Sequence, residues 1–253
     1  MTDRTSKKKT AAIHLIGGGP KIPRKGSDPL LEAAFAEAGK PNPTVAYVGA
    51  ASDDDRGFFR LLDDLFRRSG ASDVRLVALA SPRSDAAAAR ELLSRSDIVF
   101  VSGGDVEVGI AHLQRHGLVS YLRDLHDGGK PFFGASAGSI MLASRWVRWA
   151  DPDDETSAEI FPCLGMAPVV CDTHAEDDDW EELRAFLALA RNGVGFGIPT
   201  GAALRVGPDG SLTALGAAVH RLASRNGRVE RLPDLLPGAD AAATKRPAKP
   251  RAR

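Results

Sequence analysis

The chain has 253 residues, 43% hydrophobic and 26% charged, enough to bury the core of one large domain or two small ones. No apolar run approaches the roughly 20 residues of a membrane helix, and the basic N-terminus lacks the apolar segment of a secretory signal. We therefore expect no membrane partner. Two cysteines, Cys163 and Cys171, are too few for a disulfide framework, and a reducing cytoplasm is the simplest setting.

The charge is unevenly distributed along the chain. Residues 1–10 carry net +3 and residues 244–253 carry +5, which leaves the body at −8 although the formal total is zero. Both ends are low in complexity, so we predict disordered basic tails over 1–10 and 236–253 around one α/β domain over 11–235. Such tails can contact phosphates, but no aromatic or groove-reading element accompanies them, and solubilising tails are the simpler interpretation. Nucleic acid is not an expected partner.

Apolar runs and helical stripes alternate through the first half of the chain. The predicted strands cover residues 11–16, 44–50, 74–79 and 97–101, and a very short apolar run follows at 132–133. The predicted helices cover residues 28–39, 57–69, 84–95, 106–116 and 117–127. This alternation predicts a doubly wound, mostly parallel, flavodoxin-like sheet with helices on both faces. In such sheets the chemistry lies at the carboxyl ends of the strands.

The second half gives weaker signals. We expect an irregular stretch over 148–165, a strand over 166–170 and a helix over 179–191 that begins with a capping box at Asp179–Glu182. Short antiparallel strands then end the domain, at residues 203–206, 212–215, 217–223 and 228–232.

One stretch carries a nucleophile-elbow pattern. Gly134-x-Ser136-x-Gly138 lies between an apolar run and the start of a helix. Small residues two places before and after the serine let strand and helix approach closely, and the hydroxyl then projects above the sheet edge. The alternative is a small-residue turn in which Ser136 is an ordinary helix N-cap.

Four motifs in order resemble peptidase family S51, which includes aspartyl dipeptidase and cyanophycinase on a class I glutamine amidotransferase-like fold. They are Gly-Gly-Asp at 103–105, Gly-x-Ser-Ala-Gly at 134–138, Asp-x-His at 172–174 and Gly-Ile-Pro-x-Gly-x-Ala-Leu at 197–204. The resemblance runs over roughly residues 11–232. It implies a serine-type hydrolase that acts on small peptides. We expect no cofactor, and no metal because no set of His, Cys and carboxylate residues has ligand spacing.

The resemblance also implies the roles of individual residues. Ser136 is the expected nucleophile and His174 the base that takes its proton. The backbone N–H groups of Gly104 and Ala137 are the expected oxyanion donors. We expect Asp105 to contact the substrate, and a homodimer remains open. A histidine before an acidic helix could also be a solvated cap.

A serine nucleophile and its histidine base are usually completed by an acid that orients the histidine, and two positions in this sequence are candidates for that acid. An acid follows the nucleophile by about fifteen residues in dipeptidase-like members, and Asp151 stands there. In cyanophycinase-like members the acid is a Glu after Gly-Ile-Pro, where this chain has Thr200, which we also expect near the substrate. The alternative function is therefore a catalytically impaired binding protein with an amidotransferase-like fold.

The residues after His174 bear on the substrate. Cyanophycinase-like sequences carry arginines there, whereas this chain has the acidic run Glu176–Asp179. Such a run is usually a solvated face. If it reaches the cleft, it favours a free amino terminus or a basic side chain and disfavours acidic substrates.

Overall fold

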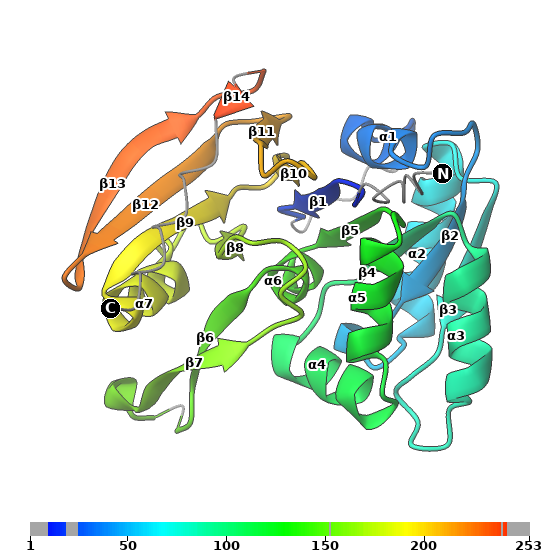
Figure 1. Cartoon of the computed structure of the whole chain (residues 1–253), viewed down its shortest axis with the longest axis horizontal. Helices are drawn as coiled ribbons and strands as arrows, with labels where there is room; N and C mark the ends of the chain where they lie inside the picture. The colour runs from blue at the N-terminus through cyan, green and yellow to red at the C-terminus, as the bar shows by residue number, and fades with distance from the viewer. Residues whose placement is uncertain (1–9, 19–24, 152, 239, 242–253) are drawn as a thin grey trace, which may run out of the picture.

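A mixed eight-stranded sheet forms the centre of the molecule (Figure 1). The computed structural model describes residues 10–18, 25–151, 153–238 and 240–241. The strands follow the order β14-β11-β10-β1-β5-β4-β2-β3, in which β1, β5, β4, β2 and β3 are parallel and β10, β11 and β14 are antiparallel. Their bounds are β1 Ile13–Ile16, β2 Thr44–Val48, β3 Asp73–Val77, β4 Ile98–Val101, β5 Phe132–Ala135, β10 Ala203–Val206, β11 Leu212–Leu215 and β14 Asp240–Ala241.

Helices cover both faces of this sheet, as the alternation predicted. Buried side chains of α1 and α2 pack on one face, and those of α3, α4, α5 and α6 pack on the other. Along β2, Val45 and Tyr47 face the first layer while Ala46 and Val48 face the second, because successive side chains of a strand alternate. The helices are α1 Pro29–Ala36, α2 Arg56–Arg68, α3 Ala86–Arg95, α4 Val106–Arg115, α5 Val119–Asp127 and α6 Ala137–Leu142, with short 3-10 helices at Ala50–Ser52 and Glu155–Ser157.

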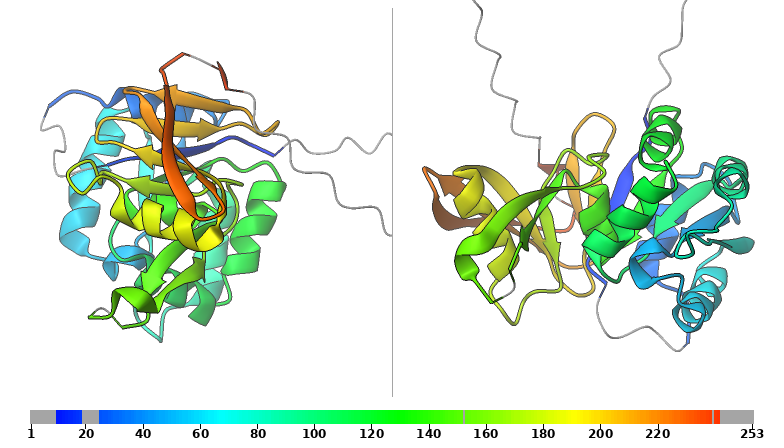
Figure 2. Two further views of the ribbon diagram at one scale, coloured as in Figure 1. Left: turned by 90° about the vertical axis from the view of Figure 1, so that its left-hand side faces the viewer. Right: turned by 90° about the horizontal axis from the view of Figure 1, so that it is seen from below.

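A smaller four-stranded sheet lies beside the first. Its order is β13-β12-β9-β8, and α7 (Glu181–Ala190) packs against it. Figure 1 and the right view of Figure 2 place this sheet on the opposite side of the molecule from α2 and α3. Its strands are β8 Cys171–Thr173, β9 Asn192–Ile198, β12 Val219–Arg225 and β13 Arg228–Leu235. His174, which follows β8, therefore belongs to a second sheet. The sequence pattern did not predict that sheet.

The middle of the chain differs most from the expectation. The stretch predicted as irregular contains a hairpin of β6 (Arg145–Trp149) and β7 (Ala158–Pro162). The strand predicted over 166–170 is wrong, since that segment has no ladder partner and β8 begins only at Cys171. No helix in the described ranges is both long and apolar enough to cross a bilayer.

Two boundaries also shift. The capping box predicted at Asp179–Glu182 is wrong: Asp178 Oδ1 accepts from the Trp180 N–H, and Trp180 takes a left-handed conformation before α7 begins. At the C-terminus, β14 pairs with β11, which carries the large sheet past the domain end predicted at residue 235. Residues 1–9 and 242–253, where the tails were predicted, lie outside the described residues.

Candidate active site

The turn after β5 has the geometry of a nucleophile elbow. Ser136 adopts φ +55° and ψ −129°, a conformation that L-residues rarely take. A Cβ on Gly134 would lie 2.5 Å from the carbonyl carbon of Gly138, and a Cβ on Gly138 would lie 2.0 Å from the carbonyl oxygen of Val101. The two glycines of the motif therefore permit the close approach of strand and helix, as their spacing predicted.

Loops from three parallel strands meet around Ser136. Its N–H donates to the Ile16 carbonyl at the end of β1, over 3.1 Å. After β4, a Cβ on Gly103 would lie 3.1 Å from the Ser136 Cβ. Parallel strands end at one edge of the sheet, so residues distant in sequence converge there.

His174 reaches the serine from the smaller sheet. It follows β8 directly, and its N–H donates to the Ile198 carbonyl of β9 over 3.0 Å. Its Nε2 lies 2.8 Å from Ser136 Oγ, within hydrogen-bonding distance. Its backbone φ of +42° lies in the left-handed region. The predicted nucleophile and base are thus brought together across the two sheets.

The two predicted oxyanion donors lie beside Ser136, in the loop after β4 and at the start of α6. In the described part of the chain, neither Gly104 nor Ala137 donates its N–H to a backbone carbonyl. Gly104 has φ +138°, and a Cβ there would lie 1.9 Å from the carbonyl oxygen of Ala51. The next residue, Asp105, anchors this loop by donating its N–H to that same carbonyl over 2.7 Å. Only glycine fits at position 104.

A cavity of about 350 Å³ opens beside the Ser136–His174 pair. Its acidic side chains are Asp105, Asp172, Asp178 and Glu182, and its other lining residues are Gly104, Val106, Ala137, Ile140, Trp146, Thr173 and Ala175. Burial raises the pKa of Asp172 to about 7, and the charge of Glu182 adds to that rise. Burial also raises the pKa of Glu182, although the indole N–H of Trp146 donates to its Oε2 over 2.8 Å and acts against the rise.

The two predicted substrate-binding residues, Asp105 and Thr200, line different hollows. Asp105 lines the cavity and caps α4 by accepting from the Val108 N–H. Thr200 is exposed, its N–H donates to Glu176 Oε1 over 2.6 Å, and it lines a separate hollow beside α1 and α2.

Asp151 stands apart from the cavity. It follows β6 in the turn of the β6–β7 hairpin, which extends to the lower left in Figure 1 with its turn at the far end. Its Oδ1 accepts from the Asp153 N–H, and its own N–H donates to Ser157 Oγ. No hydrogen bond links it to His174 among the described residues. Its role as the triad acid stays a prediction.

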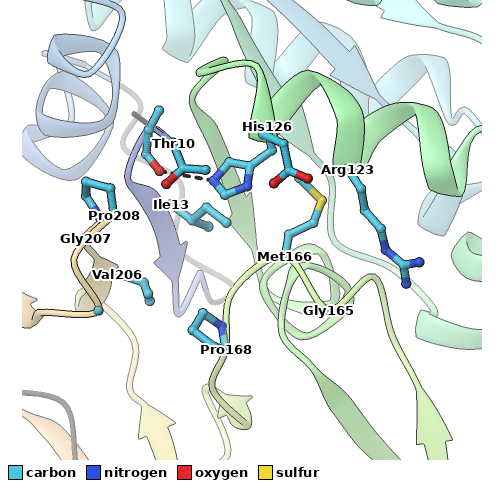
Figure 3. Close-up of a pocket in the computed structure, with 13 residues that line it drawn as sticks. Thr10, Ile13, Arg123, His126, Gly165, Met166, Pro168, Val206, Gly207 and Pro208 are labelled. Atoms are coloured by element: carbon cyan, nitrogen blue, oxygen red, sulfur yellow. Dashed lines mark hydrogen bonds between the residues drawn. The ribbon is translucent and has the colours of Figure 1, made fainter. Parts of the chain in front are cut away.

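The two cysteines are buried in the core and do not take part in the site. Burial raises the pKa of Cys163 to about 12 and that of Cys171 well above its ordinary value, so neither thiol is a reactive nucleophile. Figure 3 shows a separate cavity of about 300 Å³, at the amino end of β1, where His126 Nε2 hydrogen-bonds the Ala11 carbonyl. It lies at the opposite end of β1 from Ser136.

Several cavity residues were not predicted site residues, and Asp172, Glu182 and Trp146 are the ones that bear on the chemistry. Asp172 had a visible signal, because a carboxylate inside a short apolar run two residues before the base is unusual. Glu182 was placed in a helix cap, and Trp146 lies in the hairpin that the sequence did not predict.

Comparisons with known proteins agree with this architecture. The model of peptidase family S51 matches residues 13–213. Peptidase E of Streptomyces coelicolor is 32% identical over 159 residues, which cover 58% of this chain and 63% of that protein. Peptidase E of Haemophilus influenzae is 23% identical over 125 residues, which cover 46% and 57%. The chain thus spans about three fifths of the length of these relatives.

The fold also matches a solved structure. A peptidase from an acI-B1 Actinobacterium superposes with a TM-score of 0.66 at 15% identity, over 93% of this chain and 98% of that one. At this identity the match concerns the fold alone. The family model covers most of the chain and includes both Ser136 and His174. The chain belongs to peptidase family S51.

Proposed function

We propose that this chain is a serine-type hydrolase that cleaves small peptides in the manner of a dipeptidase, in a cytoplasmic setting. The observation that carries the proposal is the 2.8 Å contact between Ser136 Oγ and His174 Nε2, with the serine held on a strained elbow. Membership of peptidase family S51 and the relatives named Peptidase E both support peptide hydrolysis.

The reaction proceeds through an acyl-enzyme. His174 Nε2 takes the hydroxyl proton as Ser136 Oγ bonds to the substrate carbonyl carbon. The carbonyl oxygen becomes an oxyanion that accepts hydrogen bonds from the N–H groups of Gly104 and Ala137. His174 then donates its proton to the departing amine as the C–N bond breaks. Water, deprotonated by His174, attacks the ester, releases the carboxylic acid and restores the serine hydroxyl.

The test is direct labelling of the nucleophile. A fluorophosphonate should add one phosphonyl group to Ser136, located by peptide mass spectrometry, and Ser136→Ala should abolish both labelling and dipeptide hydrolysis. Ser94→Ala, an exposed serine on α3, is the matched control and should retain both. Turnover by a folded Ser136→Ala protein would overturn the mechanism.

A second candidate is a binding protein that kept the fold and lost catalysis. It is favoured by Thr200 in place of the glutamate, and by the absence of a carboxylate hydrogen-bonded to His174 among the described residues. A Ser136 that resists phosphonylation, together with no turnover across a dipeptide library, would favour this candidate.

A further inference from the structure

The cavity beside Ser136 is acidic. Four carboxylates line it, and His174 is its single basic side chain among the described residues. Asp178 belongs to the run after His174, so that run does reach the cavity. Glu182 is half-buried, and the Trp146 indole N–H fixes its carboxylate over 2.8 Å. Of the four carboxylates, Asp172 is buried and Glu182 is half-buried, whereas Asp105 and Asp178 are exposed, so packing holds two of them at the cavity.

Asp172 gives the second, independent observation. Its side chain is 4% exposed, yet it lines the cavity. Its Oδ1 accepts from the Thr173 N–H over 2.7 Å, whereas its Oδ2 meets no donor in hydrogen-bonding geometry in the described chain, although the backbone N–H of Leu183 also acts to lower the pKa of this carboxyl. A buried carboxylate oxygen without a partner is costly, because burial removes its water without replacing it. A ligand that donates a hydrogen bond or brings a positive charge would remove that cost.

Acidic side chains also line a hollow next to this cavity. A neighbouring hollow of about 660 Å³ shares Trp146, Asp178 and Glu182 with the cavity. Its one basic lining residue in the described ranges is Arg148, which is paired with two carboxylates, Glu107 at 2.8 Å and Glu159 at 2.6 Å. In the part of the chain that the structure describes, neither hollow is therefore lined by an unpaired lysine or arginine that could receive a substrate carboxylate.

We propose that this acidic pocket, formed by Asp172, Asp178 and Glu182, binds a cationic group of the substrate. The group is an α-ammonium or the side chain of lysine or arginine, placed so that the adjoining carbonyl carbon meets Ser136. This inference rests on the proposed function. A cation near a desolvated carboxylate stabilises its charged form, and a charge-assisted hydrogen bond is stronger than a neutral one. An aspartyl or glutamyl side chain in the same place is repelled.

A matched substrate panel separates the two sources of the cation. Lys-Ala, Leu-Ala and Asp-Ala carry a cationic, a neutral and an anionic first side chain, and Nα-acetyl-Lys-Ala lacks the α-ammonium. If the pocket binds the side chain, Lys-Ala and its acetylated form are cleaved and Leu-Ala is poor. If it binds the α-ammonium, Lys-Ala and Leu-Ala are similar and acetylation abolishes cleavage. In both cases kcat/KM for Asp-Ala is lower by about 10- to 100-fold, the range of a charged hydrogen bond. Asp-Ala as the best substrate overturns the proposal.

Variants test the assigned carboxylates. Glu182→Gln and Asp172→Asn should each raise KM for the preferred cationic substrate about 10-fold and leave kcat within about 3-fold. Asp177→Asn is the matched control: it removes one charge from the same acidic run at an exposed residue that lines neither hollow. Unchanged KM in both pocket variants, or an equal rise in the control, contradicts the assignment.

A binding measurement keeps this inference separate from the catalytic proposal. Calorimetry with the full-length Ser136→Ala protein should detect the preferred cationic dipeptide, with weaker binding when Asp172→Asn or Glu182→Gln is added. If fluorophosphonate labels Ser136 but Asp-Ala binds best, the function stands and the acidic pocket fails. If Ser136 resists labelling but Lys-Ala binds and both variants weaken it, the hydrolase proposal fails and the pocket stands.

Discussion

The two walls of the cleft are built from different parts of the chain. The nucleophile wall consists of Ser136 with Gly103, Gly104, Gly134 and Gly138, all at the carboxyl edge of the large sheet. Its shape is set by main chain, since a Cβ on any of the four glycines would lie within 3.1 Å of another atom. The ionisable side chain on this side of the cavity is Asp105, which follows Gly104 and caps α4.

The base wall is built from side chains. It consists of His174, Asp172, Asp178, Glu182 and Trp146, which come from the smaller sheet, the start of α7 and the β6–β7 hairpin. At the four glycines of the nucleophile wall the backbone lies so close to other atoms that not even a methyl group fits. In the base wall, by contrast, one side chain can be replaced by another of similar size. From this comparison we expect changes in the nucleophile wall to alter catalysis, and changes in the carboxylates of the base wall, as distinct from His174, to alter substrate binding.

Gly104→Ala tests the nucleophile wall and should have the largest effect. The new Cβ would lie 1.9 Å from the Ala51 carbonyl oxygen, so the loop must shift and carry the Gly104 N–H away from the oxyanion. Loss of one oxyanion donor costs about 10²- to 10³-fold in kcat, and we expect a drop of at least that size with the best dipeptide.

Gly193→Ala is the control for that change. Gly193 has φ +142°, close to the +138° of Gly104, but a Cβ there meets nothing within 4 Å. It should lower the free energy of unfolding by about 1 kcal/mol and leave kcat within about 2-fold. Equal losses of kcat in the two variants would show that backbone strain, and not the donor at position 104, is responsible.

Asp172→Asn tests the base wall through the pH dependence of stability. The pKa of Asp172 is about 7 in the folded chain, raised by burial and by the neighbouring charges of Glu182 and Asp178, against about 4 when unfolded. The folded state therefore binds this proton more tightly, and its stability falls as pH rises from about 4 to about 7. The loss is at most about 4 kcal/mol and is complete above pH 7.

The asparagine variant cannot release that proton. Urea unfolding at pH 5 and pH 8 should show that the variant loses less stability than the native protein between the two values. Asp177→Asn, which changes an exposed carboxylate, should follow the native protein. Parallel pH profiles for Asp172→Asn and the native chain would show that this carboxyl is ionised at no cost, contrary to its burial.

Much of the nucleophile wall was predictable because its signals are local. The alternating apolar runs predicted the succession of β1 to β5 and their helices along the chain, and the spacing of two glycines indicated the elbow at Ser136. The family S51 motifs also pointed to His174. That Oγ and Nε2 lie 2.8 Å apart depends on the packing of two sheets, which no local pattern encodes.

The base wall was harder to predict because its segments are stabilised by distant partners. Met166 and Ala167 donate their N–H groups to the Leu142 carbonyl at the end of α6, so an apolar run forms buried coil where a strand was expected. The hairpin that carries Trp146 consists of two five-residue strands without a turn signal such as Asn-Gly between them. A buried position alone does not distinguish strand from coil.

The smallest effect is expected for Asp151→Asn. If Asp151 oriented His174, neutralising it would leave the imidazole in the wrong tautomer and lower turnover by about 10⁴-fold. The hairpin instead holds this carboxylate exposed in its own turn, bonded to the Asp153 N–H, where solvent screens its charge. We therefore expect kcat within about 3-fold of the native value, measured with the best dipeptide at pH 7 to 8.

Thr200→Glu completes this test, because it restores the glutamate that cyanophycinase-like sequences have at this place. The Thr200 N–H already donates to Glu176 Oε1, and a second carboxylate beside it adds repulsion. An increase in turnover in this variant, with Asp151→Asn unchanged, would identify position 200 as the acid site and the native chain as an enzyme weakened there. A large loss in Asp151→Asn would instead require the hairpin to close over His174. If neither variant changes turnover, His174 acts without a carboxylate at either position.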